Sequence, residues 1–205
     1  CCIRYNIKFT LQMRNSFNRP AAELGVPLAI KAVRMIPSVT EYSAKQFWTK
    51  RGFAMSEHSG GCLCGDLRYK VMGNPEIGAV CHCRYCQLRT GSAFGTLAYF
   101  KDENVKITAG KAKEYSFTSE SGTQWKTVFC DTCATTVFIK LEVRAGLTGV
   151  TAGTLDPPTF WFELDREVFT RSKAHFVGDI IAKDTHETIA YYAPQIDEPK
   201  RRKGG

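Results

Sequence analysis

The segment CHCRYC at residues 81–86 carries three cysteines, and two shorter motifs, CLC at 62–64 and CDTC at 130–133, carry four more. Residues i and i+2 of an extended segment face the same side, so a C-x-C pair can aim both sulfurs at one ion. A C-x-x-C pair in a tight turn can do the same, and Zn²⁺ takes four such soft ligands in a tetrahedron. The spacing therefore predicts zinc sites.

Counting ligands favours two ions. The first and last motifs together supply four thiolates, a closed structural set: Cys62, Cys64, Cys130 and Cys133. The middle motif supplies three, which leaves an open fourth position typical of catalytic zinc: Cys81, Cys83 and Cys86. Spacing alone does not decide which pairs meet. His82 is disfavoured as a ligand because both of its neighbours would already be ligands of the same ion.

Two other interpretations of the cysteines are weaker. Structural disulfides would not leave an odd count of seven, and they would call for a secretory signal that the sequence lacks. One zinc site plus buried free thiols is possible in principle, but the tight C-x-C-x-x-C argues against it. Cys1 and Cys2 lie apart from the seven.

Charge is uneven along the 205 residues, whose formal net charge is +8. Residues 1–54 hold nine Lys or Arg against two Asp or Glu, and residues 200–203 are all basic. Residues 55–199 hold fifteen Lys or Arg against eighteen Asp or Glu, so this part is mildly acidic. The basic character belongs to the ends, which does not favour a nucleic-acid partner. No apolar run of about 18 residues predicts a membrane span.

The chain divides into three expected segments. Residues 1–54 contain three prolines and read as a basic N-terminal extension, a leader or a non-native start, with Met55 a plausible start of translation. A mitochondrial presequence is the alternative for this stretch. Residues 55–199 form the expected zinc-binding domain, and residues 200–205 form a basic disordered tail. We expect a cytoplasmic location, with mitochondrion and nucleus left open.

The domain reads as short strands separated by turn residues. We expect a mainly β fold, an antiparallel sandwich or part-open barrel, with one short helix at 84–91. The expected strands are 67–71, 93–100, 105–107, 114–117, 124–129, 136–141, 147–153 and 167–171.

The motifs GGCLCGDLRYKV (60–71), CHCRYCQLRTGSAFG (81–95) and FCDTC (129–133) resemble the glutathione-dependent formaldehyde-activating enzyme (GFA) family, which includes centromere protein V relatives. The resemblance covers roughly residues 60–176 and implies an Mss4-like antiparallel β fold of two sheets. It also implies the zinc assignment given above, four ligands and three. Ala134 is a departure, because members often carry glycine after the last cysteine, at the turn of the zinc knuckle.

The family's named activity is the addition of glutathione to formaldehyde, formally that of a carbon–sulfur lyase. We therefore expect a zinc enzyme that binds a small glutathione-like thiol at the open site and adds it to a small aldehyde. In this mechanism the substrate thiolate is the nucleophile and the three cysteines are ligands. The alternatives are a zinc-scaffolded binding module for a protein or nucleic acid, and a redox sensor that loses metal on oxidation.

Contacts to the thiol are less well defined in the sequence. Arg84, Arg89 and Lys173 are candidate partners for its carboxylates, although such residues are more often solvated surface charges. His58 and His175 are not assigned a catalytic role. The aromatic residues Phe94, Trp125 and Trp161 are expected to fill the core.

Overall fold

Strand β4 (Gly95–Lys101) shows how the sequence builds the fold, because its successive side chains enter two different cores. Ala98 and Phe100 pack into the largest buried cluster, whereas Leu97 and Tyr99 pack into another. Alternate side chains of a strand point to opposite faces of its sheet. This strand is therefore buried on both faces of its sheet.

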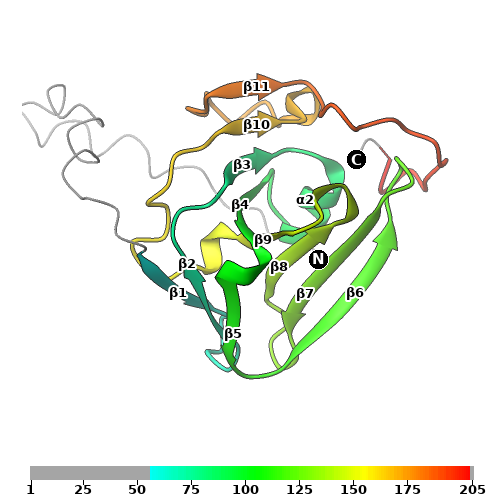
Figure 1. Ribbon diagram of the computed structural model, residues 1–205. Helices are drawn as coiled ribbons and strands as arrows, with labels where there is room; N and C mark the ends of the chain where they lie inside the picture. The colour runs from blue at the N-terminus through cyan, green and yellow to red at the C-terminus, as the bar shows by residue number, and fades with distance from the viewer. Residues whose placement is uncertain (1–55, 204–205) are drawn as a thin grey trace, which may run out of the picture. The chain divides into compact units, whose positions relative to one another are not determined.

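The computed structural model describes residues 56–203, and these residues form eleven strands in two sheets with one α-helix. The smaller sheet is antiparallel in the order β1 (Glu57–Gly61), β2 (Arg68–Met72) and β5 (Val105–Ala109). The larger sheet runs in the order β11 (Asp184–His186), β10 (Arg166–Val168), β3 (Ile77–Cys81), β4, β9 (Leu147–Thr151), β8 (Thr136–Leu141), β7 (Gln124–Cys130) and β6 (Ala112–Thr118) (Figure 1). The predicted mainly β fold of two sheets is confirmed.

The largest core lies between the two sheets. Tyr69 and Val71 of β2 pack with Phe100, Phe138 and residues of β9, all of them buried. The Tyr69 ring meets the edge of Phe138 at a centroid distance of 4.9 Å. The Tyr69 hydroxyl is satisfied by Thr154 Oγ1 at 2.7 Å. Burying apolar rings while pairing the polar atom they carry is what makes this interface stable.

The sheet departs from the predicted antiparallel pattern at one edge. Strand β10 pairs in parallel with both β3 and β11. Three strands were not predicted. Strand β3 is a continuous apolar run, IGAVC, because both of its faces are buried, so it lacks the alternation used to find the other strands. Strand β1 is polar and glycine-rich, and β11 has only three exposed residues.

Helix α2 (Arg84–Thr90) confirms the predicted short helix. It begins directly after Cys83 and ends at Gly91, whose φ of +65° is the left-handed conformation that favours glycine. Tyr85 and Cys86 are its buried residues. The helix therefore turns the last cysteine of the middle motif inward. Within the part of the chain that is described, no helix is long and apolar enough to cross a membrane.

The expected leader, residues 1–54, lies outside the described residues. At the other end, Arg202 pairs with Glu198 at 2.8 Å and Lys203 with Asp197 at 3.0 Å. The division into leader, domain and tail stays a prediction.

The turn between β7 and β8 contains Ala134 at a φ of +58°. Its backbone N–H donates to the Cys130 carbonyl at 3.0 Å, which closes the turn around the CDTC motif. The left-handed region costs a residue with a Cβ atom about 1–2 kcal/mol. The glycine that the family often carries after the last cysteine would avoid this strain.

Replacing Phe100 with alanine should lower the free energy of unfolding by about 3–5 kcal/mol, because a fully buried ring is removed from the core between the sheets. The matched control is Phe176→Ala, since Phe176 is 71% exposed and should lose no more than about 0.5 kcal/mol. Urea unfolding at equal metal content checks both. Equal losses in the two variants would contradict this core.

Ala134→Gly should stabilise the protein by about 1 kcal/mol, because relief of the left-handed strain exceeds the entropy that glycine adds to the unfolded chain. The control is Ala145→Gly, an exposed residue with an ordinary φ of −51°, which should destabilise by about 0.4–1 kcal/mol. Urea unfolding of the three proteins at the same metal load measures both. A destabilising Ala134→Gly would show that the turn is not strained.

Candidate metal centres

Four cysteines from two distant parts of the chain meet at one point. The sulfur atoms of Cys62, Cys64, Cys130 and Cys133 all lie within 4.8 Å of one another. The Sγ atoms of Cys62 and Cys64 are 3.4 Å apart, and those of Cys64 and Cys130 are 3.8 Å apart. Two sulfurs bound to one tetrahedral zinc at about 2.3 Å would lie about 3.8 Å apart. The spacing of this cluster therefore fits a four-thiolate zinc site.

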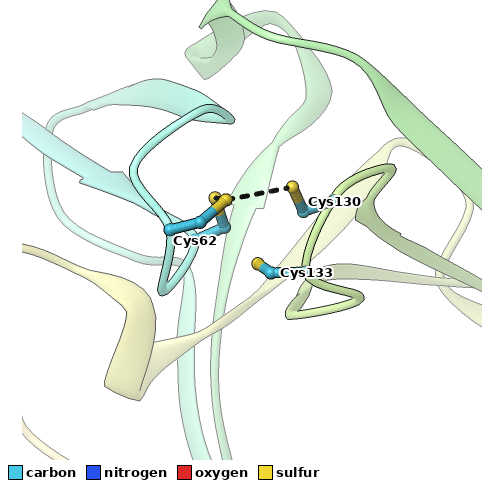
Figure 2. A group of neighbouring side chains, drawn as sticks. Cys62, Cys130 and Cys133 are labelled. Atoms are coloured by element: carbon cyan, nitrogen blue, oxygen red, sulfur yellow. Dashed lines mark hydrogen bonds between the residues drawn. The ribbon is translucent and has the colours of Figure 1, made fainter.

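The local chain explains why these sulfurs converge. Cys62 follows strand β1, and Gly65 turns the chain back at a φ of +85° so that strand β2 can begin. A Cβ atom on Gly61 would lie 2.6 Å from the Leu67 carbonyl oxygen, so this close approach requires glycine. Figure 2 shows Cys62 on one side of the cluster and Cys130 and Cys133 on the other, with their sulfurs pointing toward one another.

Backbone N–H groups and a hydroxyl surround these sulfurs. The Leu67 N–H donates to Cys62 Sγ at 3.2 Å, and the Thr132 N–H donates to Cys130 Sγ at 3.4 Å. Thr135 Oγ1 lies 3.1 Å from Cys133 Sγ. The hydroxyl and backbone N–H of Thr135 lower the pKa of Cys133 to about 5. Such donors stabilise thiolates, which is the form that a metal ion binds.

The other three cysteines form a second, fully buried cluster. The sulfur atoms of Cys81, Cys83 and Cys86 lie within 4.8 Å of one another, and no fourth ligand side chain from residues 56–203 joins them. Hydrogen bonds from the Cys81 and Cys83 thiols hold the pKa of Cys86 well below its usual range, and the Arg89 guanidinium adds to this effect. The same hydrogen bonding, together with burial, raises the pKa of Cys81. The donor set is that of a three-thiolate metal site with one position left open.

His82 lies between two of these cysteines but does not join them. Its ring is fully buried, and its Nε2 atom lies 3.0 Å from Glu167 Oε1. Its backbone N–H donates to the Val168 carbonyl at 3.0 Å. His82 therefore ties the cysteine loop to strand β10.

A pocket opens beside the three-cysteine cluster. All three cysteines line it, and its volume is about 60 Å³. Its walls come from one face of the larger sheet and from a C-terminal stretch that contains Ile189, Tyr191 and Tyr192. The walls are mainly apolar and include Leu97, Tyr99, Trp125, Val168, Phe169 and Tyr192. Aromatic walls of this kind exclude water and strengthen electrostatic interactions inside the pocket.

Arg144 supplies a cation to the pocket. It ends the 3₁₀ turn η4 (Glu142–Arg144), and its guanidinium lies 4.8 Å from the centroid of the Tyr99 ring and 5.8 Å from that of Tyr191. Its Nε atom is buried with no hydrogen-bond partner among the described residues. The side chain is held by aromatic rings, and its charge is free for an anion.

The three basic residues expected to contact the thiol are not part of this pocket. Arg84 donates from Nε to the Arg201 carbonyl at 2.8 Å, and Lys173 pairs with Glu167 at 2.8 Å. Arg89 lies behind Cys86, in the space left by the missing side chain of Gly95. Arg144 and Arg166 are the basic residues that line the pocket; neither was expected from the sequence, and no motif marks them.

The aromatic residues expected in the core have different roles. Trp161 is buried in the largest core and stacks on His58 at a centroid distance of 3.6 Å. Trp125 packs against two clusters and also lines the pocket. Phe94 is half-buried near His82. His175 is exposed and does not line the pocket.

Comparison with known proteins agrees with the cysteine pattern. The profile of the family described as glutathione-dependent formaldehyde-activating enzyme matches residues 57–172. A crystal structure of a Rhodobacter sphaeroides protein is 19% identical, with a TM-score of 0.38, and the alignment covers 51% of this chain and 95% of that one. No curated protein in the comparison matches. The family profile spans more than half of the chain and includes all seven clustered cysteines, so the chain belongs to the GFA family.

Proposed function

We propose that this protein is a zinc-dependent, carbon–sulfur lyase-type enzyme that adds a small thiol to a small aldehyde. The observation that carries the proposal is the buried three-cysteine cluster, which lacks a fourth ligand among the described residues and opens into a pocket. The family's name associates such a site with glutathione and formaldehyde. We assign the four-cysteine cluster to a structural zinc and the three-cysteine cluster to a catalytic one.

The proposed chemistry requires little from the protein beyond binding and orientation. A zinc ion held by Cys81, Cys83 and Cys86 would supply an open position at which a substrate thiol loses its proton. The cysteines act as ligands, so the attacking group is the substrate's own sulfur. As a bond forms between that sulfur and the aldehyde carbon, the π bond of the carbonyl breaks and its electron pair moves to oxygen. The oxygen takes up a proton, which balances the one that the thiol releases to solvent. No redox cofactor is consumed.

The pocket residues would hold the two reactants together. The walls formed by Tyr99, Trp125 and Phe169 keep bulk water away from the cluster. Arg144 faces the same space and would bind an anionic group on the thiol. Holding the aldehyde beside the thiol in one small pocket accelerates their reaction by proximity.

The competing view, a binding module that uses its basic tail, receives less support. Arg202 and Lys203 already pair with Glu198 and Asp197 within the chain. The Arg202 guanidinium also lies 5.5 Å from the centroid of the Phe117 ring. These contacts leave fewer free cations for a nucleic acid or acidic protein.

The test is the zinc content of the full chain and of the Cys81→Ser/Cys83→Ser/Cys86→Ser variant. Two zincs per chain should fall to one in the variant, and thiol binding measured by calorimetry should disappear. The control is Cys64→Ser/Cys133→Ser at the less buried pair, which should lose the other zinc and unfold more easily.

A single zinc in both the wild type and the triple variant, with no thiol binding, would refute the enzyme proposal and leave a structural zinc protein. If the triple variant does not fold, cobalt replaces zinc in the wild-type protein. Adding a thiol should then change the visible absorption of the bound cobalt, and an unchanged spectrum would equally refute the proposal.

A further inference from the structure

Apart from the three cysteines, the charged side chains that line the pocket have one sign. Arg144 and Arg166 line it, and no Asp or Glu of the described chain does. Among residues 56–203, no carboxylate forms an ion pair with Arg144, whose guanidinium lies over the rings of Tyr99 and Tyr191. Hydroxyl groups of Ser119, Ser121 and Thr123 complete the polar lining. The pocket can therefore bind an anionic group, but it has no carboxylate partner for an ammonium group.

This charge pattern suits glutathione poorly. Glutathione carries two carboxylates and one ammonium group, and the two arginines could bind only the carboxylates. The ammonium would enter a largely apolar space beside two cations, where it would lose its hydration without gaining a partner. A thiol that lacks the ammonium group avoids this cost.

Size gives a second, independent constraint. The pocket volume is about 60 Å³. An apolar protein cavity that takes up benzene measures roughly 150 Å³. A short mercapto-acid has as many non-hydrogen atoms as benzene, so even this thiol would extend toward the opening of the pocket, and a tripeptide would extend much further.

The C-terminal stretch sets that size. Ile189, Tyr191 and Tyr192 line the pocket, and they lie beyond the residues matched by the family profile. Figure 1 shows this stretch passing from β11 toward the ends of β6 and β7. A larger thiol would have to pass these residues or displace them.

Hydrogen bonds hold the C-terminal stretch at Tyr192 and at Glu198. The Tyr192 hydroxyl donates to Glu120 Oε2 at 2.8 Å, and the Gln195 N–H donates to the Glu120 carbonyl at 2.8 Å. The Tyr85 hydroxyl donates to the buried Glu198 at 2.8 Å and accepts from the Glu120 N–H at 2.7 Å. Displacing the stretch would break several of these hydrogen bonds, so the small pocket is the stable form.

We infer that the thiol substrate of this protein is a short mercapto-acid, with an anionic group bound by Arg144 and no ammonium group, rather than glutathione. The inference rests on the proposed function, because it requires the thiol to sit at the three-cysteine site. It assigns selectivity for this substrate to Arg144 and to the C-terminal stretch.

The experiment measures the binding of three thiols to the zinc-loaded full chain by calorimetry: 3-mercaptopropionate, 3-mercaptopropanamide and glutathione. The first two differ only in the charge of the carboxylate. We expect the acid to bind about tenfold or more tightly than the amide, because the amide lacks the negative charge that pairs with the Arg144 guanidinium. We expect glutathione to bind at least about tenfold more weakly than the acid.

Substitutions of Arg144 test whether this residue causes the preference for the acid over the amide. Arg144→Met should bring the acid-to-amide ratio to about one by weakening the binding of the acid, and Arg144→Lys should keep part of the preference. The matched control is Lys106→Met, which removes an exposed charge from the smaller sheet and should preserve the ratio. Zinc content and circular dichroism confirm that each variant is folded and loaded.

The outcomes separate the two proposals. If glutathione binds as tightly as the acid, or if the preference survives Arg144→Met, the inferred substrate class is wrong while the thiol enzyme stands. If none of the three thiols binds the zinc-loaded protein, the proposed function is wrong, and this inference, which depends on it, is wrong as well.

Discussion

The convergence of four cysteines from the two sheets is the constraint on which the rest of the structure depends. Cys62 and Cys64 follow the first strand of the small sheet, whereas Cys130 and Cys133 belong to the turn between β7 and β8 of the large sheet. Joining them fixes the distance at which the two sheets face each other. The core of Tyr69, Phe100 and Phe138 fills that gap, so packing and the sulfur cluster specify the same arrangement.

The large sheet then carries two functions on its two faces. One face closes on the small sheet and is wholly structural. The other presents Leu97 and Tyr99 beside Cys81, because β3 and β4 pair in register with Ala79 opposite Leu97. Central strands that are buried on both faces can hold three sulfurs and an aromatic wall in fixed positions, which is what the proposed site needs.

Much of the fold and of the cysteine clusters could be predicted from the sequence, because these features depend on residues that are close together in the chain. The seven clustered cysteines, helix α2 and the strands with alternating patterns depend on spacing within a few residues. Strand β3 was missed because burial on both faces removes the alternation. Arg144 could not be found, since its place in the pocket depends on Tyr99 and Tyr191, which are far from it in sequence. Arg84 and Lys173 were proposed because they lie near the motifs, but their charges are used elsewhere in the fold.

Tyr191 and Tyr192 lie beyond the residues matched by the family profile, so the residues proposed to select the thiol are separate in sequence from those proposed to react with it. The residues matched by the family profile contain both cysteine clusters and Arg144, so they contain the groups that would carry out the reaction. The residues that close the pocket follow them and are held by Glu120 and Glu198. A change in this stretch can therefore resize the pocket without touching the cysteines. Membership of the family is then compatible with a thiol other than the one in the family's name, because the ligand set constrains the sulfur atom and the stretch constrains what is attached to it.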